Sequence, residues 1–332
     1  MEVTISLTPL SYNWIRSIFA GCAIAASLSV PSAWAQDRVL RLVIAFPPGG
    51  PVDIVARVIA EPLAKELNQR VIVENKPGGN GAVAAQAVAH SVPDGSTLWL
   101  TSVGAAAINP VLYEKLPYDM ERDFSPVALV VDNDELLVVH PANPARDAAE
   151  FVSNAKKSSQ PVAIASSGVG SIPHLAMEQL ADATKANLLH VPYKGAAPAI
   201  TDVIGGQVAA FFGDVPGLIG HVRAGKLRAI GVAAARRHPL LPEVRTLAEQ
   251  GLPGVDSNNW YALFVPVRTP AAVIGALNEA VRRTLATPAV GERLLASGTT
   301  PAPSSPQELS VLLRRDTEKW GWLIRMKNIT PN

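Results

Sequence analysis

The unit at residues 40–67, an apolar strand followed by a glycine turn and a helix, constrains the fold of this chain most strongly. Residues 40–45 predict a buried strand, and the apolar spacing changes to a helical period directly after the turn. Gly49 and Gly50 leave main-chain N–H groups uncovered, and Asp53 lies just inside the predicted helix, where a carboxylate interacts favourably with N-terminal N–H groups. The turn is therefore either an ordinary connection or a site for a small anion.

The first 35 residues are typical of a secretory signal peptide. An apolar run at residues 18–30 follows Arg16, and it is shorter than the roughly 20 residues of a membrane-spanning helix. The sequence Ala33-Trp34-Ala35 has the small-x-small cleavage pattern, so we predict cleavage after its last alanine. Cys22, the one cysteine of the chain, lies in this leader, and too little apolar sequence precedes it to favour lipidation. The remainder must bury its own cores without disulfides, and its length suits about two domains.

Three predicted strands at residues 40–45, 70–75 and 97–101 alternate with helical segments. This β-α-β-α-β order predicts a parallel sheet with helices on both faces. Ser102 directly follows the third strand, so we expect it at the same carboxyl edge as the turn at residues 46–50. Ligands of such sheets bind outside the carboxyl ends of the strands.

Beyond Pro141 the alternation of strands and helices starts afresh, which predicts a second α/β lobe. Strands at 127–131 and 136–140 take the chain toward it, and residues 260–267 predict a second crossing strand that returns the chain. We therefore predict two lobes that are joined by a two-strand hinge and separated by a ligand cleft. Lobe 1 is predicted from residues 36–137 and 259–332, and lobe 2 from residues 138–258.

The loop at residues 166–171 of the second lobe repeats the design of the first turn. Its sequence, Ser-Ser-Gly-Val-Gly-Ser, supplies N–H and O–H donors without bulk between a strand and a helix, which suits a carboxylate or a phosphate. The loop lacks the third glycine of a dinucleotide fingerprint and contains no Gly-x-Ser-x-Gly elbow. A flexible, capped loop without a ligand is the alternative.

Three further side chains are candidates for the second-lobe side of the cleft. His174 either faces the cleft from a predicted helix start or is satisfied within the structure. Lys194 is the cation of the predicted cleft loops of this lobe, or is simply solvated. Asp214 ends a buried strand, where it orients loop amides, binds a ligand ammonium group or caps the next helix.

The composition and the remaining motifs argue against an enzyme or a nucleic-acid-binding protein. The formal net charge is +1 without a basic run. The six histidines show no metal-ligand spacing, and no nucleophile stands beside a base, so we predict no metal, no cofactor and no catalytic residue. Residues 220–226 have the spacing of a P-loop, but the following Ser or Thr is missing and the segment runs from helix to strand.

Several segments together resemble the Bug family, the periplasmic solute-binding proteins of tripartite tricarboxylate transporters. The resemblance covers nearly all of the chain beyond the leader, in one order. The segments are Phe46-Pro-Pro-Gly-Gly-Pro-Val-Asp53, Val73-Glu-Asn-Lys-Pro-Gly-Gly79, Pro93-Asp-Gly95, Ile108-Asn-Pro-Val-Leu-Tyr113, Leu116-Pro-Tyr-Asp119, Ser166-Ser-Gly-Val-Gly-Ser171 with His174, His190-Val-Pro-Tyr-Lys-Gly195, Ala224-Gly-Lys-Leu-Arg-Ala229 and Trp260-Tyr-Ala-Leu-Phe264.

The resemblance implies a type II-like, two-lobed (Venus flytrap) binding protein in the periplasm of a Gram-negative bacterium. It implies a monomer that closes on a small carboxylate, such as a dicarboxylate, a tricarboxylate, an acidic amino acid or an aromatic acid. The implied partners are one large and one small membrane subunit of a transporter. The expected ligand-binding residues are Phe46, Pro48, Gly49, Gly50, Asp53, Ser102, Ala106, Ser166, Ser167, Gly170, Ser171, His174, Lys194 and Asp214.

Two departures from the family pattern bear on the ligand. The predicted loop at residues 102–107 is unusually apolar, which favours a less charged or partly aromatic acid, and Gly213 stands where an apolar residue is common. The alternatives are a binding protein for a non-carboxylate compound, such as a nicotinamide-like molecule, and an orphan sensor that presents its ligand to a signalling receptor.

Overall fold

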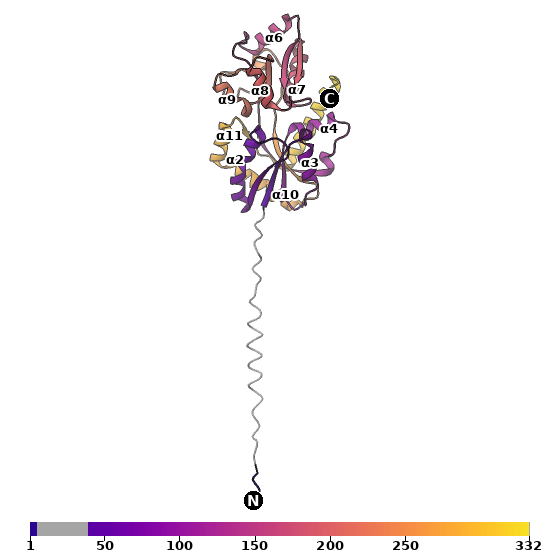
Figure 1. Ribbon diagram of the computed structural model, residues 1–332, viewed down its shortest axis with the longest axis vertical. Helices are drawn as coiled ribbons and strands as arrows, with labels where there is room; N and C mark the ends of the chain where they lie inside the picture. The colour runs from indigo at the N-terminus through magenta and orange to yellow at the C-terminus, as the bar shows by residue number, and fades with distance from the viewer. Residues whose placement is uncertain (5–38, 332) are drawn as a thin grey trace. The chain divides into compact units, whose positions relative to one another are not determined.

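The computed structural model describes residues 1–4 and 39–331. The predicted signal peptide and its cleavage site after Ala35 lie outside the described residues, except for the first four. The compact unit that begins at Val39 carries the elements described below (Figure 1). Within the described residues no helix is both long and apolar enough to cross a membrane.

The first of two sheets has six strands, in the order β11-β4-β10-β3-β1-β2. Strand β1 pairs in parallel with β2 and with β3, which confirms the parallel pairing predicted from the sequence. Strand β10 is antiparallel to both β3 and β4, so the sheet is mixed. The strands are β1 (Val39–Ile44), β2 (Arg70–Asn75), β3 (Thr97–Ser102), β4 (Phe124–Asp132), β10 (Tyr261–Pro266) and β11 (Thr300–Pro301).

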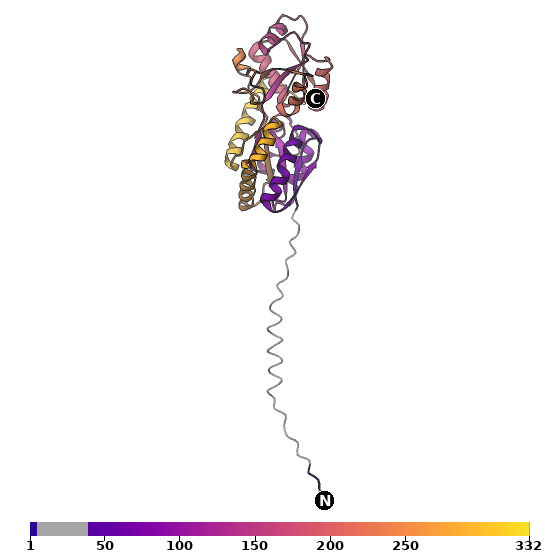
Figure 2. The same cartoon turned by 90° about the vertical axis from the view of Figure 1, so that its left-hand side faces the viewer.

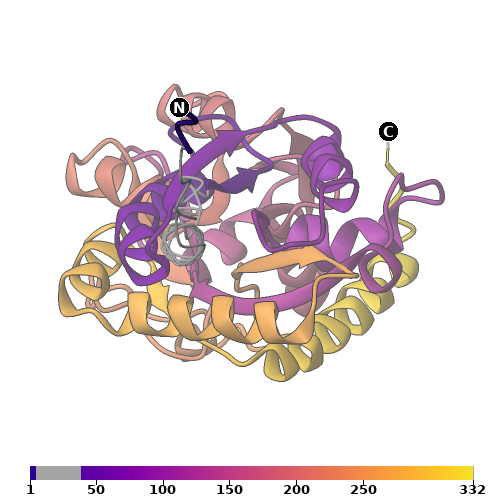
Figure 3. The same ribbon diagram turned by 90° about the horizontal axis from the view of Figure 1, so that it is seen from below.

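Helices cover both faces of the first sheet, and this explains why its strands are apolar on both sides. Leu42 and Leu263 pack toward α2, α10 and α11, whereas Val43 and Phe264 belong to a cluster with α3, η3 and α12. Figure 3 shows α10 in orange and α12 in yellow along the edge where β4 lies. The helices are α2 (Pro51–Leu67), η2 (Gly79–Gly81), α3 (Ala82–Ala89), η3 (Gly104–Ile108), α4 (Asn109–Leu112), α5 (Met120–Asp123), α10 (Ala271–Ala286), α11 (Pro288–Ala296) and α12 (Pro306–Met326).

The second sheet has five strands in the order β7-β6-β8-β5-β9, again with helices on both faces. Figures 1 and 2 show its helices grouped around it. Strand β5 is antiparallel to both of its neighbours, and β6 is parallel to β7 and β8. Its elements are β5 (Glu135–Val139), α6 (Ala148–Lys157), β6 (Val162–Ser166), α7 (Ile172–Thr184), β7 (Leu188–Pro192), α8 (Ala196–Ile204), β8 (Ala210–Asp214), α9 (Val215–Arg223), β9 (Arg228–Val232) and η4 (Ala248–Gln250).

The chain passes from the first sheet to the second through Asn133 and Asp134, and returns between β9 and β10. The changes of sheet thus fall between Asp132 and Glu135 and between Val232 and Tyr261. The lobe boundaries that we drew from the sequence remain a prediction.

Two local features differ from the sequence-based expectation. The sequence predicts a kink or a restart near residues 60–62, because a proline inside a helix removes one main-chain hydrogen bond. The structure shows no restart, and α2 continues as one element through Pro62. Residues 104–108, expected as part of an open loop, form a π-helix that leads directly into α4. The alanines of this segment are buried in the cluster between the first sheet and α12, and their packing gives the helix its support.

Candidate functional site

The turn before α2 is held by a buried carboxylate. Asp53 Oδ2 accepts hydrogen bonds from the Gly49 main-chain N–H at 2.9 Å and from Arg57 Nε at 2.8 Å. Its Oδ1 accepts from Asn75 Nδ2 at 3.0 Å, and the same amide donates to the Phe46 carbonyl. The carboxylate therefore joins the turn, the first turn of α2 and the end of β2.

The charge of Asp53 fits this role. Burial raises the pKa of the Asp53 carboxyl. The hydrogen bonds from Arg57, Gly49 and Asn75, together with the positive charge of Arg57, lower this pKa by more than burial raises it. The net pKa therefore lies below the usual 3.8. Gly49 has φ of +82°, a conformation that favours glycine, and it is exposed at the tip of the turn with Pro48. The turn thus has a fixed main chain and an open outer side.

The loop after β6 is closed on itself by side-chain hydrogen bonds. Ser166 Oγ donates to the Gly168 carbonyl and accepts from the Gly168 N–H, and it lies 2.6 Å from His190 Nε2. Ser171 caps α7: its Oγ accepts from the His174 N–H at 3.4 Å and donates to the Gly168 carbonyl at 2.7 Å. These bonds fix the loop within the protein.

Two stacked histidines support the same loop. The rings of His174 and His190 lie 3.6 Å apart and nearly parallel. His174 Nδ1 accepts the N–H of Gly170 at 3.0 Å, so this nitrogen carries no proton. Burial and the charge that His174 can acquire lower the pKa of His190 to about 4. His174 is therefore satisfied within the loop, one of the two roles left open by its sequence position.

Asp214 joins the second sheet to the returning crossing. Both of its oxygens lie 3.0 Å from Asn259 Nδ2, and its Oδ2 accepts the hydroxyl of Tyr261 at 2.5 Å. Asp214 occupies the N-cap position before α9, but its side chain makes no capping hydrogen bond to that helix. The carboxylate thus ties the end of β8 to the segment that leads into β10.

A second carboxyl group stands beside Asp214. Glu135 is fully buried, and it pairs with Asp214 across β5 and β8. No described residue donates a hydrogen bond to either of its oxygens. Burial first, and then the charge and hydrogen bonding of Asp214, raise the pKa of the Glu135 carboxyl well above 4.5. The Glu135 carboxyl therefore keeps its proton to a higher pH than an exposed glutamic acid does.

The two halves of the molecule touch at several places, two of which lie beside the predicted site loops. A Cβ atom at Gly170 would lie 2.2 Å from Leu112 Cδ2, so the loop after β6 rests directly on α4. A Cβ atom at Gly217, in the first turn of α9, would lie 3.6 Å from Pro51 Cγ, in the first turn of α2. Ile172 also belongs to the core cluster of the first sheet. The predicted site loops therefore lie at the contacts between the two sheets.

A family model described as "Tripartite tricarboxylate transporter family receptor" matches residues 55–329. The chain belongs to this family.

The relatives of this receptor chain match it over nearly their full lengths. The protein BugT of Bordetella pertussis is 34% identical over 312 residues, which cover 94% of this chain and 95% of BugT. The structure of MatC from Rhodopseudomonas palustris with bound malate is 33% identical, with a TM-score of 0.78, over 86% of this chain and 99% of that one. A second R. palustris structure, with adipate, is 30% identical, with a TM-score of 0.84, over 90% of this chain and all of that one. These matches confirm the Bug family and the two-lobed α/β fold of periplasmic binding proteins.

Within this receptor chain the predicted site residues fall into two groups. The polar groups of Asp53, Ser166, Ser171, His174 and Asp214, and the N–H of Gly170, are used inside the protein. In the described chain no residue hydrogen-bonds to the hydroxyls of Ser102 or Ser167, or pairs with the exposed Lys194. The Gly49 N–H is also used, by Asp53, and Pro48 has no N–H. Contact of a solute with the second group, or with the turn at Phe46, Pro48, Gly49 and Gly50, stays a prediction.

The expected ligand contact at Ala106 stays a prediction. Ala106 is 1% exposed, packs in the core cluster of the receptor's first sheet, and lines an outer groove beside α12. The apolar residues 105–107 serve this packing, so they give no ground for a less charged or aromatic acid.

Sequence reasoning missed the residues that hold the receptor's loops from behind. These are Asn75, His190, Asn259 and Tyr261. It also missed Glu135, the buried neighbour of Asp214. One signal was available, because an acid at the start of the apolar run Leu-Leu-Val-Val in β5 is rare inside a protein unless it has a role. No group of three metal-ligating side chains occurs in the part of the chain that the structure describes.

Proposed function

We propose that this chain is a periplasmic solute-binding protein that captures a small carboxylate between its two lobes and delivers it to a tripartite membrane transporter. The observation that carries the proposal is the shared design of the turn before α2 and the loop before α7. Each ends a strand of a parallel pair, opens a helix N-terminus and has its side chains hydrogen-bonded internally. The N–H groups of Gly49, Gly168 and Gly170 are used in these bonds, so the donors that we propose for an anion are the remaining main-chain N–H groups at the starts of α2 and α7.

The relatives support the same ligand class. One solved relative holds malate and another holds adipate, and the matches cover 86% and 90% of this chain. Both are dicarboxylic acids, so a small dicarboxylate is the first candidate. Ser102, Ser167 and Lys194 are the side chains that we propose as contacts, because their polar groups have no partner among the described residues.

Closure follows from the contacts between the lobes. A ligand that touches both loops binds the closed form more tightly and shifts the population toward it. The lobes, the hinge and the boundaries at residues 137/138 and 258/259 are part of this proposal. In the same proposal the protein is a monomer, it has no cofactor, and it carries out no reaction.

The test begins with the full gene product, exported through its own leader in a Gram-negative host and purified from the periplasm. N-terminal sequencing checks the predicted cleavage after Ala35. Thermal unfolding is then followed with malate, adipate, citrate, glutamate, benzoate and nicotinamide. A ligand at 100 times its Kd adds about 2.7 kcal/mol to the free energy of unfolding, which is a shift of several degrees for a protein of this size.

A shift with the acids alone supports the proposal, and Ser167→Ala should then reduce the affinity by roughly tenfold or more, as expected for a hydrogen bond to a charged group. The matched control is Ser158→Ala, at the C-cap of α6, which leaves the affinity unchanged. A shift with nicotinamide alone, or consumption of any of these compounds, contradicts the proposal.

A further inference from the structure

Helix α12 carries an exposed apolar stripe. Among the described residues, Trp99, Trp260 and Trp320 are buried, whereas Trp322 is 59% exposed. Met326, one turn further on, is 41% exposed. These two side chains lie on one face of the helix because residues four apart are neighbours there. Exposed tryptophan and methionine side by side are typical of protein interfaces.

The stripe continues into a groove on the outside of the first lobe. Arg314 and Glu318 precede Trp322 at four-residue steps, and both line a groove of about 530 Å³. The opposite wall is the segment from Ala106 to Arg122. Its floor is apolar and aromatic, with Tyr113 half-buried and Met120 buried. The stripe and the groove form one surface, which we call the α12 surface.

The groove side of the α12 surface is acidic. Four carboxylates and two guanidinium groups line it, and one of the latter, Arg122, is bound to Asp123. In the described chain no cation pairs with Glu114, Glu121 or Glu318. Unpaired acids above an apolar floor are complementary to a segment that carries Lys or Arg beside an apolar side chain.

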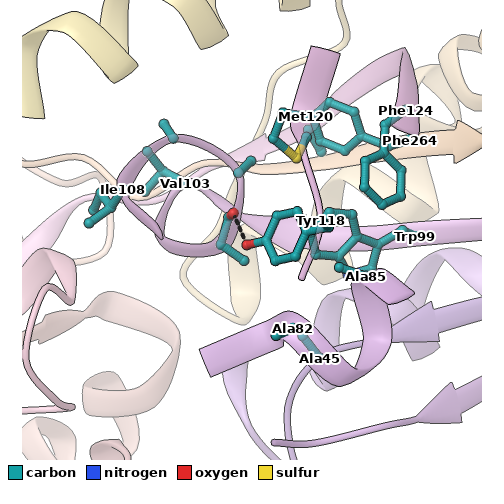
Figure 4. Packing of buried hydrophobic residues seen from close by; sticks show 14 of the residues in the cluster. Ala45, Ala82, Ala85, Trp99, Val103, Ile108, Tyr118, Met120, Phe124 and Phe264 are labelled. Carbon is teal, nitrogen blue, oxygen red and sulfur yellow. Dashed lines mark hydrogen bonds between the residues drawn. The ribbon is translucent and has the colours of Figure 1, made fainter. Parts of the chain in front are cut away.

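The wall of the groove also reaches the contact between the lobes. Tyr118 Oη donates a hydrogen bond to the Ala105 carbonyl of η3, as the dashed line in Figure 4 shows. Burial raises the pKa of the Tyr118 hydroxyl, so it stays protonated. The π-helix η3 leads into α4, whose Leu112 meets Gly170 of the second lobe. A movement of the second lobe at this contact therefore acts on the same short segment that shapes the groove.

We propose that the α12 surface is where this protein docks on a membrane protein, through a periplasmic segment of that partner that carries basic and apolar side chains. The inference rests on the proposed delivery to a transporter, and it adds the surface and the chemistry of the contact. Because η3 and α4 link the groove to the lobe contact, the surface is complete when the second lobe rests on α4.

The experiment places the photoreactive residue p-benzoyl-phenylalanine at Trp322 of the full chain in its native host. The control carries it at Val92, an equally exposed apolar residue in the turn after α3. Irradiated cells are fractionated, and the cross-linked peptides are identified by mass spectrometry. The expected product from position 322 is an integral membrane protein, with a Lys or Arg near the linked residue, and its yield increases with malate or adipate.

A charge-reversal pair tests the acidic wall. Glu121→Lys with Glu318→Lys should lower the cross-link yield by roughly tenfold or more, because two attractions become repulsions. The matched control reverses Glu243 and Glu292, which are exposed on other faces, and should leave the yield unchanged. Both variants should keep the wild-type thermal shift with the carboxylate probes.

Other results of these experiments would each contradict one part of the proposals. A cross-link to a second copy of this chain, or a yield no higher than at Val92, overturns the docking surface. An equal loss in both charge-reversal variants overturns the role of the acidic groove. Loss of the carboxylate shift in unmodified protein contradicts the proposed function instead, and the cross-linked product then still reports on the docking surface.

Discussion

The contact between Gly170 and Leu112 allows the closure of the two lobes to be tested with a single methyl group. In Gly170→Ala the new Cβ would lie 2.2 Å from Leu112 Cδ2 and 3.6 Å from Ile108 Cγ2. Carbon atoms pack at about 3.5–4.0 Å, so the loop and the Leu112 side chain must separate by roughly 1.3 Å or more. The clash exists only when the second lobe rests on the first.

Overpacking of this kind costs about 1–3 kcal/mol, which corresponds to a carboxylate affinity roughly 5- to 150-fold weaker. The substitution has a second, separate cost in backbone strain. Gly170 has φ of +73°, and an alanine in that conformation costs about 1–2 kcal/mol in the open and closed forms alike. This second cost lowers the melting temperature but not the affinity.

The assay is isothermal titration with the acid that gives the largest thermal shift. Gly195→Ala is the matched control, because Gly195 has φ of +111° with open space around its Cβ position, so it adds strain without a clash. Adding Leu112→Ala to Gly170→Ala removes the clashing atom and should restore most of the affinity. The reasoning is refuted if Gly170→Ala binds as tightly as the wild type, or if the double variant binds no better than the single one.

Three further predictions concern the buried carboxyl groups. Asp53→Asn should lower the free energy of unfolding by about 2–3 kcal/mol at pH 7, measured by thermal unfolding, because hydrogen bonds to a charged acceptor are lost. The pKa of Asp53 is lowered in the folded protein, so this difference from the wild type should disappear as the pH falls through that pKa. Glu135→Gln should raise the melting temperature at pH 8 but not at pH 4: the raised pKa of Glu135 stabilises the fold only at low pH, and this contribution is lost as the pH rises through the folded-state pKa. A variant that melts like the wild type at both pH values would show that Glu135 is not protonated in the fold. Tyr261→Phe should cost about 1–3 kcal/mol, because Asp214 loses a buried donor, and calorimetry showing no loss would contradict the pairing.

Most strands were predictable because helices cover both faces of each sheet, but their spatial order in the sheets and the short strand β11 were not predicted. Such strands have continuous apolar sequences, and the glycine turns between them mark their ends clearly. The turn at Gly49 and the loop at Gly170 were found in this way.

The partners of the site residues were not predictable from sequence, because they come from distant strands. Asn75 reaches Asp53 from β2, and His190 reaches Ser166 from β7. The π-helix at Gly104–Ile108 was missed because three consecutive alanines show neither a helical nor a strand period. Its support comes from packing on α12, which is almost 200 residues later in the chain.

The internal hydrogen bonds of the two loops have a consequence for how such proteins diverge. When serine, histidine and aspartate side chains hold the loops in shape, the groups left for a solute are largely peptide amides, which every residue except proline possesses. Substitution of a single residue in the loop then changes the cavity little, whereas a substitution in the supporting strands tilts several amides at once. If a solute is bound by these amides, as proposed, we expect mutations behind the loops, at positions such as Asn75 and His190, to change the bound solute more than mutations within the loops.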